Sequence, residues 1–296
     1  MRVAVILSTY NQPDWLRKTL WGYARQTHRE FEVVVADDGS GADTGAVIAE
    51  VRRKYPSLQL RHVWHPDRGY RKCVILNRAA VAALGEYLVF SDGDCIPRPD
   101  FVETHARLAE PGTFLSGGAV RLPRDLSETI SEEDVASGHI FRRTWLRENG
   151  FEPGRHGLRL LDGTAAPTVL DALSPTGATW NGNNASTWRS VVLKANGFEH
   201  ELGYGGQDRE FGERIANLGV SGKLVRYRAV AVHLDHGRPY RSEESIRQNR
   251  ALRRRARDSG AVRARQGIEQ LEPEEGAFVD PPSGVVPGAP GHGEVR

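Results

Sequence analysis

The chain has 296 residues, a formal net charge of +2 and a hydrophobic content of 39%. This composition excludes a wholly disordered chain and allows one large or two small globular domains. Two cysteines are too few for a disulfide framework, which favours a reducing compartment and a cytoplasmic location. No apolar run approaches the ~20 residues that span a bilayer, so we expect any membrane contact to be peripheral.

The first hundred residues alternate between strand and helix patterns. Strands are predicted at 3–7, 31–36, 58–64 and 87–90, and helices at 13–25, 43–54 and 71–84. Strands separated by helices predict a parallel α/β sheet with right-handed crossovers. Ligands bind such sheets beyond the carboxyl ends of the strands. Polar clusters follow three of these strands: Thr9-Tyr10-Asn11, Asp37-Asp38 and Asp92-Gly93-Asp94.

The remainder is less regular. Helices are predicted at 100–108, 190–196, 207–218 and 242–257, and strands at 114–120 and 223–232. Segment 121–178 is rich in glycine, proline and charge. We expect it to form loops and a lid, with a helix around 131–147, rather than a second core.

Two carboxylates, Asp92 and Asp94, follow the apolar strand that ends at Phe90. Residues i and i+2 of an extended strand point to the same side, so the two carboxylates can converge on one point. Like charges held together repel, and a divalent cation relieves the repulsion. A simple Asp-Gly turn is the alternative interpretation.

Eight groups of residues carry a resemblance to a known family. They are Val5 to Asn11, Val34 to Ser40, Gly69 to Arg78, Phe90 to Asp94, Asn183 to Ser186, Gly197 to Glu199, Gly205 to Phe211, and His233. In this order and spacing, residues 1–235 resemble the family 2 glycosyltransferases, which have the GT-A fold. The Gly205 to Asp208 segment is most similar to the chondroitin-polymerase and galactosyltransferase-related subgroup. Gln207 departs from the glutamate that is more usual there.

The resemblance implies an α/β GT-A fold with a mostly parallel central sheet flanked by helices. It predicts a glycosyltransferase domain at 1–240, in which 1–120 bind the nucleotide and 121–240 serve the acceptor and catalysis. A basic helical extension at 241–272 and a disordered tail at 273–296 follow, because the sequence becomes arginine-rich and then rich in proline and glycine.

The implied reaction moves a sugar from a nucleotide diphosphate, UDP by expectation, to a hydroxyl acceptor with inversion. Asp94 and His233 are the expected metal ligands, with Asp92 at the ribose or at the metal through water. His236 is the alternative to His233. Carboxylate and imidazole ligands suit Mn²⁺, and Mg²⁺ remains open.

The nucleotide is expected along the first two strand ends. Thr9 and Tyr10 can supply a backbone contact and a stacking face, and Asp38, or alternatively Asp37, can accept from the base. Arg71 can reach the base or a phosphate. A helix cap and turn at Asp37-Asp38 and a solvated charge at Arg71 are the simpler interpretations.

Asp208 is the predicted general base. It follows two glycines, which allow close approach of a substrate, and it opens a helix whose N-terminus favours negative charge. The alternative is that Asp208 only caps this helix. Two other functions compete: a sugar nucleotidyltransferase, and an inactive glycan-binding subunit at a membrane. Ser8 to Pro13 lack the glycine-rich phosphate loop of the first.

Residues 241–265 include nine arginines and only three acidic residues. They predict either a solvated helix face or a helix on the anionic inner surface of a membrane, where a lipid-linked acceptor would lie. Nucleic acid is not expected as a partner, because aromatic residues do not alternate with the arginines.

Overall fold

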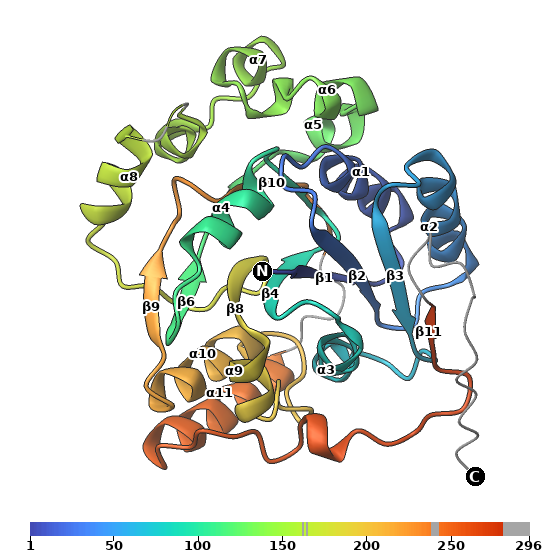
Figure 1. Cartoon of the computed structure of the whole chain (residues 1–296), viewed down its shortest axis with the longest axis vertical. Helices are drawn as coiled ribbons and strands as arrows, with labels where there is room; N and C mark the ends of the chain where they lie inside the picture. The colour runs from blue at the N-terminus through green and yellow to red at the C-terminus, as the bar shows by residue number, and fades with distance from the viewer. Residues whose placement is uncertain (162, 164, 238–242, 281–296) are drawn as a thin grey trace.

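The computed structural model describes residues 1–161, 163, 165–237 and 243–280, and Figure 1 shows their arrangement. A central eight-stranded sheet has the order β11-β3-β2-β1-β4-β8-β6-β9. The strands are β1 (Val3–Thr9), β2 (Phe31–Asp37), β3 (Gln59–Trp64), β4 (Tyr87–Asp92), β6 (Thr113–Ser116), β8 (Asn184–Trp188), β9 (Ser221–Leu224) and β11 (Phe278–Asp280). Strands β3, β2, β1 and β4 are parallel, as predicted. Strand β8 runs antiparallel to both β4 and β6.

Helices cover both faces of the sheet. One face packs against α1 (Pro13–Ala24), α2 (Ala42–Lys54) and α4 (Phe101–Leu108), and the other against α3 (Lys72–Ala82), α9 (Arg189–Lys194) and α10 (Gln207–Asn217). Alternate residues of β1 enter the two cores, with Val5 on the first face and Ile6 on the second. A strand that is buried on both faces reads as a continuous apolar run, which is why the sequence pattern located it.

A second, three-stranded sheet lies beside the first. It consists of β5 (Cys95–Pro97), β10 (Val230–His233) and β7 (Gly118–Arg121), in the order β5-β10-β7. The strands predicted at 114–120 and 223–232 are each divided between the two sheets, so both predictions are wrong in extent. Gly117 marks the first division: a Cβ on it would lie 2.1 Å from Asn184 Oδ1.

Segment 121–178 contains several short helices, and three of them stand where a single helix was predicted around 131–147. They are α5 (Arg124–Thr129), α6 (Glu132–Ala136), η1 (His139–Phe141), α7 (Arg143–Glu148), η2 (Gly154–Leu160) and α8 (Ala165–Ala172). Its apolar side chains, among them Leu126, Ile140 and Leu146, bury themselves against Ile96 and Val232 of the small sheet. The prediction that no second core forms here is therefore wrong. Helices α5, α6 and α7 lie at the top of Figure 1 in green, and α8 lies at the left.

The C-terminal part crosses the molecule from α11 (Glu243–Asp258) through η3 (Ile268–Gln270) to β11, drawn in orange and red in Figure 1. The prediction of a disordered tail is wrong for 273–280, because β11 pairs antiparallel with β3. Residues 281–296 lie outside the described part of the chain. In the described ranges, no helix is both long and apolar enough to cross a membrane.

A buried polar network joins the two sheets. His105 contacts Ser186 Oγ at 2.7 Å and Asn184 Oδ1 at 3.0 Å. The Asn184 amide donates in turn to the carbonyls of Gly118 and Ala229. Burial lowers the pKa of His105 to about 4, so its imidazole is neutral in the folded protein near neutrality.

This network predicts a loss of stability in mild acid. Below pH ~6.5 the unfolded chain protonates the imidazole while the folded protein does not, so His105 alone should lower the unfolding free energy by about 2 kcal/mol between pH 7 and pH 5. Urea unfolding of His105→Gln should show a weaker pH dependence than that of the unaltered chain. His139→Gln is the control. Equal pH dependence of His105→Gln and the unaltered chain would contradict this role.

Candidate active site

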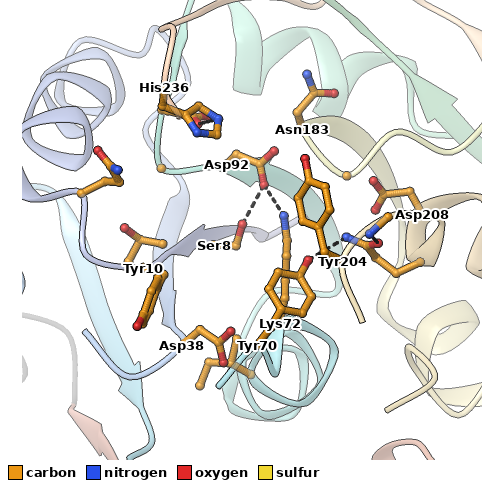
Figure 2. A pocket seen from close by; sticks show the side chains of 18 of the residues that line it. Ser8, Tyr10, Asp38, Tyr70, Lys72, Asp92, Asn183, Tyr204, Asp208 and His236 are labelled. Atoms are coloured by element: carbon orange, nitrogen blue, oxygen red, sulfur yellow. Dashed lines mark hydrogen bonds and ion pairs between the residues drawn. The ribbon is translucent and has the colours of Figure 1, made fainter. Parts of the chain in front are cut away.

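One cavity of about 620 Å³ opens beyond the carboxyl ends of β1 and β4 and faces the start of α10. Its lining includes seven predicted residues: Thr9, Tyr10, Asp38, Asp92, Asp94, Asp208 and His233. Figure 2 shows Asp38 and Tyr10 on one side of the cavity and Asp208 on the other, with Asp92 between them. The structure thus brings together residues separated by more than two hundred positions of the chain.

Asp94 lies at the junction of the two sheets with two histidines. Its carboxylate is 3.8 Å from His233 Nε2 and 2.9 Å from His236 Nε2. Antiparallel pairing of His233 with Cys95 makes this contact possible. Burial opposes ionisation of Asp94, but the hydrogen bond from His236 and the two imidazoles hold its pKa below the usual value.

These three side chains offer the oxygen and nitrogen donors that suit Mn²⁺. Asp94, Cys95 and His233 place one donor atom each within 4.8 Å of one another. Burial raises the pKa of the Cys95 thiol, which donates to Asp94 Oδ1 and is a poor ligand in that form. Asp94 with one of the two imidazoles, His233 or His236, therefore offers donors that fit a divalent ion.

Asp92 is held by two donors on its own side of the cavity. Its Oδ1 accepts from Ser8 Oγ and from Lys72 Nζ, each at 2.7 Å, as the dashed lines in Figure 2 show. Burial alone would lower the pKa of Lys72, but Asp92 holds it well above the usual value. The cavity therefore contains a permanent cation, which the sequence pattern did not favour over Arg71.

The structure does not bring Arg71 to the cavity, in contrast to its predicted contact with the base or a phosphate. Its guanidinium donates to Glu274, with Nη2 2.9 Å from Oε1, and to the carbonyl of Pro66. Glu274 also lies within ion-pair distance of Arg68 and Arg78. Glu274, in the segment between η3 and β11, thus binds the Arg71 guanidinium. No local sequence pattern could indicate so distant a partner.

Asp38, rather than Asp37, faces the cavity. The Asp38 carboxylate contacts His65 Nε2 at 2.7 Å and accepts from the Arg71 backbone N–H at 3.0 Å. Burial raises the pKa of Asp38, and these two contacts oppose the rise. Asp37 does not line the cavity, and it accepts from the Ser40 N–H and contacts His62.

Asp208 is the second residue of α10 and follows Gly205 and Gly206, which adopt φ values of +93° and +98°. Its Oδ1 is buried and has no hydrogen-bond partner among the described residues. Burial raises the pKa of Asp208, while the charge of Lys72 opposes the rise. A raised pKa makes a carboxylate a stronger proton acceptor, so the environment suits a general base.

Gln207 joins this side of the cavity to Tyr70, which precedes α3. Its amide Nε2 donates to Tyr70 Oη at 3.0 Å, and its Oε1 accepts from the Gly205 N–H at 3.0 Å. Glutamate at this position could accept from both groups but could not donate to the phenol. Gln207 therefore helps to hold in place the loop from Gly203 to Gly206, which we call the glycine loop.

Asn249 of α11 also contacts the glycine loop. No sequence pattern predicted this contact. Its buried amide donates to the carbonyls of Gly203, Tyr204 and Gly205, while its Oδ1 accepts from the Gly203 N–H. Both glycines that precede Asp208 need left-handed backbone, so the loop has little intrinsic stiffness. The amide of Asn249 supplies the constraint.

We expect Asn249→Ala to reduce turnover roughly 10-fold, because a small misplacement of a reacting group is costly. UDP affinity should stay unchanged, and hydrogen exchange should accelerate in peptides covering 203–208. Arg253→Ala is the matched control: it removes an ion pair between α11 and Glu213 of α10 but leaves the loop contacts intact. Equal loss of turnover in both variants would show that only helix attachment matters.

Comparison with known proteins identifies the family. The model of glycosyl transferase family 2 matches residues 4–152. The chain belongs to glycosyltransferase family 2. It is 29% identical over 228 residues to validoxylamine A glucosyltransferase of Streptomyces hygroscopicus subsp. jinggangensis, a match that covers 74% of this chain and 52% of the relative. It is 33% identical over 254 residues to chondroitin synthase of Escherichia coli, a match that covers 78% of this chain and 34% of the relative.

Two solved structures have the same fold as this chain. S. aureus TarS gives a TM-score of 0.58 at 19% identity, with 86% of this chain and 39% of that chain covered. Mannosyltransferase PcManGT from Pyrobaculum calidifontis, in complex with GDP-Man and Mn2+, gives a TM-score of 0.54 at 24% identity. This match covers 85% of this chain and 61% of that chain. These likenesses confirm the predicted fold. The chain spans about half the length of the first curated relatives it matches.

Proposed function

We propose that this chain transfers a sugar from a nucleotide diphosphate, with UDP as the preferred nucleotide, to a hydroxyl acceptor with inversion. The proposal rests chiefly on one observation: a single cavity contains the Asp94–histidine donor set, the nucleotide-side residues and Asp208. Family 2 membership supports the reaction class. Relatives named for the synthesis of chondroitin and hyaluronan favour a glycan acceptor in polysaccharide or glycoconjugate assembly.

In this proposal the nucleotide lies across the ends of β1 and β2. Asp38 accepts a hydrogen bond from the base, and Tyr10 offers an aromatic face at the same end. Asp92 lies beside the ribose or binds the ion through water. The complexes of TarS with UDP and with UDP-GlcNAc support the choice of UDP, whereas PcManGT was solved with GDP-Man. A comparison of UDP- and GDP-sugars therefore tests this choice.

A divalent ion, Mn²⁺ or Mg²⁺, would be held by Asp94 with His233 or His236. When bound, it supplies a Lewis acid that stabilises negative charge on the leaving diphosphate. Lys72 adds a fixed positive charge beside Asp92.

Asp208 accepts the proton of the acceptor hydroxyl as that oxygen attacks the anomeric carbon. The new carbon–oxygen bond forms while the bond to the diphosphate breaks, and the electron pair leaves with the diphosphate. Attack from the face opposite the leaving group inverts the anomeric centre in one displacement. The elevated pKa of Asp208, caused by burial, fits a group that takes a proton in this step.

The direct test is release of nucleoside diphosphate from a panel of UDP-, GDP- and TDP-sugars with Mn²⁺, with and without oligosaccharide acceptors. We expect turnover with a UDP-sugar that is abolished by a chelator. A chain that releases pyrophosphate from nucleoside triphosphate and sugar phosphate would instead be a nucleotidyltransferase. Failure to bind or turn over any donor would favour the inactive glycan-binding alternative.

A further inference from the structure

Arg121 lines the cavity next to the candidate metal ligands. It ends β7 and pairs in parallel register with His233 of β10. Paired residues of neighbouring strands point to the same face of a sheet. Arg121 and His233 accordingly both line the cavity. No motif singled out Arg121, and none of the proposed steps uses it.

Two further arginines flank the same strand. Arg159 of η2 donates to the carbonyl of Ala119. Arg226, in the turn after β9, lies against Gly118, because a Cβ on that glycine would be 2.9 Å from Arg226 Cγ. Gly118 thus admits the arginine stem beside the strand. Arg121 thus ends β7, and Arg159 and Arg226 both contact the same strand.

A fourth arginine, Arg155, lies on η2 together with Arg159. Burial lowers the pKa of His156, and the positive charges of Arg159, Arg155, Arg121 and Arg226 lower it further. Arg159 itself has a pKa below the usual value, because burial and the charges of Arg226 and Arg155 oppose its protonated form. We call Arg121, Arg155, Arg159 and Arg226 the arginine cluster.

The arginine cluster lacks compensating acids. Within the residues that the structure describes, none of its four members forms an ion pair with an aspartate or glutamate. Nearby Asp171 is already engaged with Arg228 at 2.7 Å. Gathered like charges repel, so an unpaired cluster at a cavity favours a ligand of opposite charge. Guanidinium groups bind carboxylate and phosphate through paired hydrogen bonds.

We propose that the arginine cluster binds an anionic group of the acceptor, a carboxylate or a phosphate, while the acceptor hydroxyl lies at Asp208. This inference rests on the proposed function and narrows the acceptor to an acidic glycan or glycan-like polymer. The donor diphosphate does not account for the cluster, because only Arg121 lines the cavity itself. The other three members lie beyond it, on η2 and on the turn that follows β9.

Binding of three fluorescently labelled probes separates the sources of charge. They are a hyaluronan tetrasaccharide with carboxylates, a four-unit glycerol phosphate oligomer, and neutral chitotetraose. Anisotropy is measured without nucleotide and again with saturating UDP and Mn²⁺, so that the diphosphate occupies its own site. We expect at least one anionic probe to bind about tenfold more tightly than the neutral probe.

Arg155→Gln and Arg226→Gln should each reduce that preference about tenfold, because each removes one charged hydrogen-bonding partner. Arg254→Gln is the matched control, since Arg254 is an exposed arginine on α11. Failure of both anionic probes to bind more tightly than chitotetraose would overturn the proposal, as would equal effects of all three substitutions. Absence of UDP binding alone would instead count against the proposed function, because the probe ratio is also measured without UDP.

Discussion

Replacing Asp208 by asparagine is expected to reduce sugar transfer by about 10³-fold. Asparagine keeps the size of the side chain but cannot accept the hydroxyl proton. The Asp208 carboxylate lines the cavity and is the group that would take the proton. UDP affinity should change by no more than about twofold, because the carboxylate contributes to the chemical step rather than to nucleotide binding. Initial rates of UDP release and a UDP titration measure both quantities.

Glu213→Gln provides the control, because Glu213 lies on the same helix and pairs with Arg253 of α11. It should leave the transfer rate within about twofold. In the unaltered chain, the rate should fall as the pH drops through the raised pKa of Asp208, since the protonated carboxyl cannot act as a base. Retention of more than a tenth of the rate in Asp208→Asn would exclude Asp208 as the base.

Replacing Asp94 by asparagine is expected to weaken Mn²⁺-dependent UDP binding roughly 100-fold or more. The carboxylate is the charged member of the donor set, and even partners in the outer shell of a metal site contribute 10- to 100-fold to affinity or activity. Calorimetric titration of UDP, with Mn²⁺ and with a chelator, measures the effect. The metal-dependent part of the affinity should disappear, and the weak metal-independent part should remain.

Asp125→Asn tests whether removing any acid near the small sheet has this effect. Asp125 is exposed in the first turn of α5. Its UDP titrations should match those of the unaltered chain. If UDP binding to Asp94→Asn kept its full dependence on Mn²⁺, the metal site would lie elsewhere. His233→Gln and His236→Gln, titrated in the same way, separate the two histidines that lie next to Asp94.

The donor half of the fold was predictable because its signals are local. Strands β1, β2 and β4 are apolar on both faces, so their sequences read as continuous runs, and each is followed by polar residues. Parallel strands place those polar residues at one edge of the sheet. This topology is why the sequence alone predicts Thr9, Asp38 and Asp92 in one cavity.

The rest depends on contacts between distant segments. Arg71 turns away from the cavity because Glu274 lies beside it, and Asn249 donates to the carbonyl of Gly203, which lies 46 residues earlier in the chain. Neither contact leaves a periodic pattern in the sequence. The sequence of segment 121–178 does not indicate a core, because its short helices bury single apolar residues against the small sheet and such brief turns have no clear period.

The position of the metal tests the central claim most directly. Crystals of the chain grown with UDP and Mn²⁺ would be measured near the manganese absorption edge. The account predicts one anomalous peak within coordination distance of the Asp94 carboxylate and an imidazole of His233 or His236, in contact with the UDP diphosphate. A bound UDP with no such peak, or a peak remote from Asp94, would contradict the account.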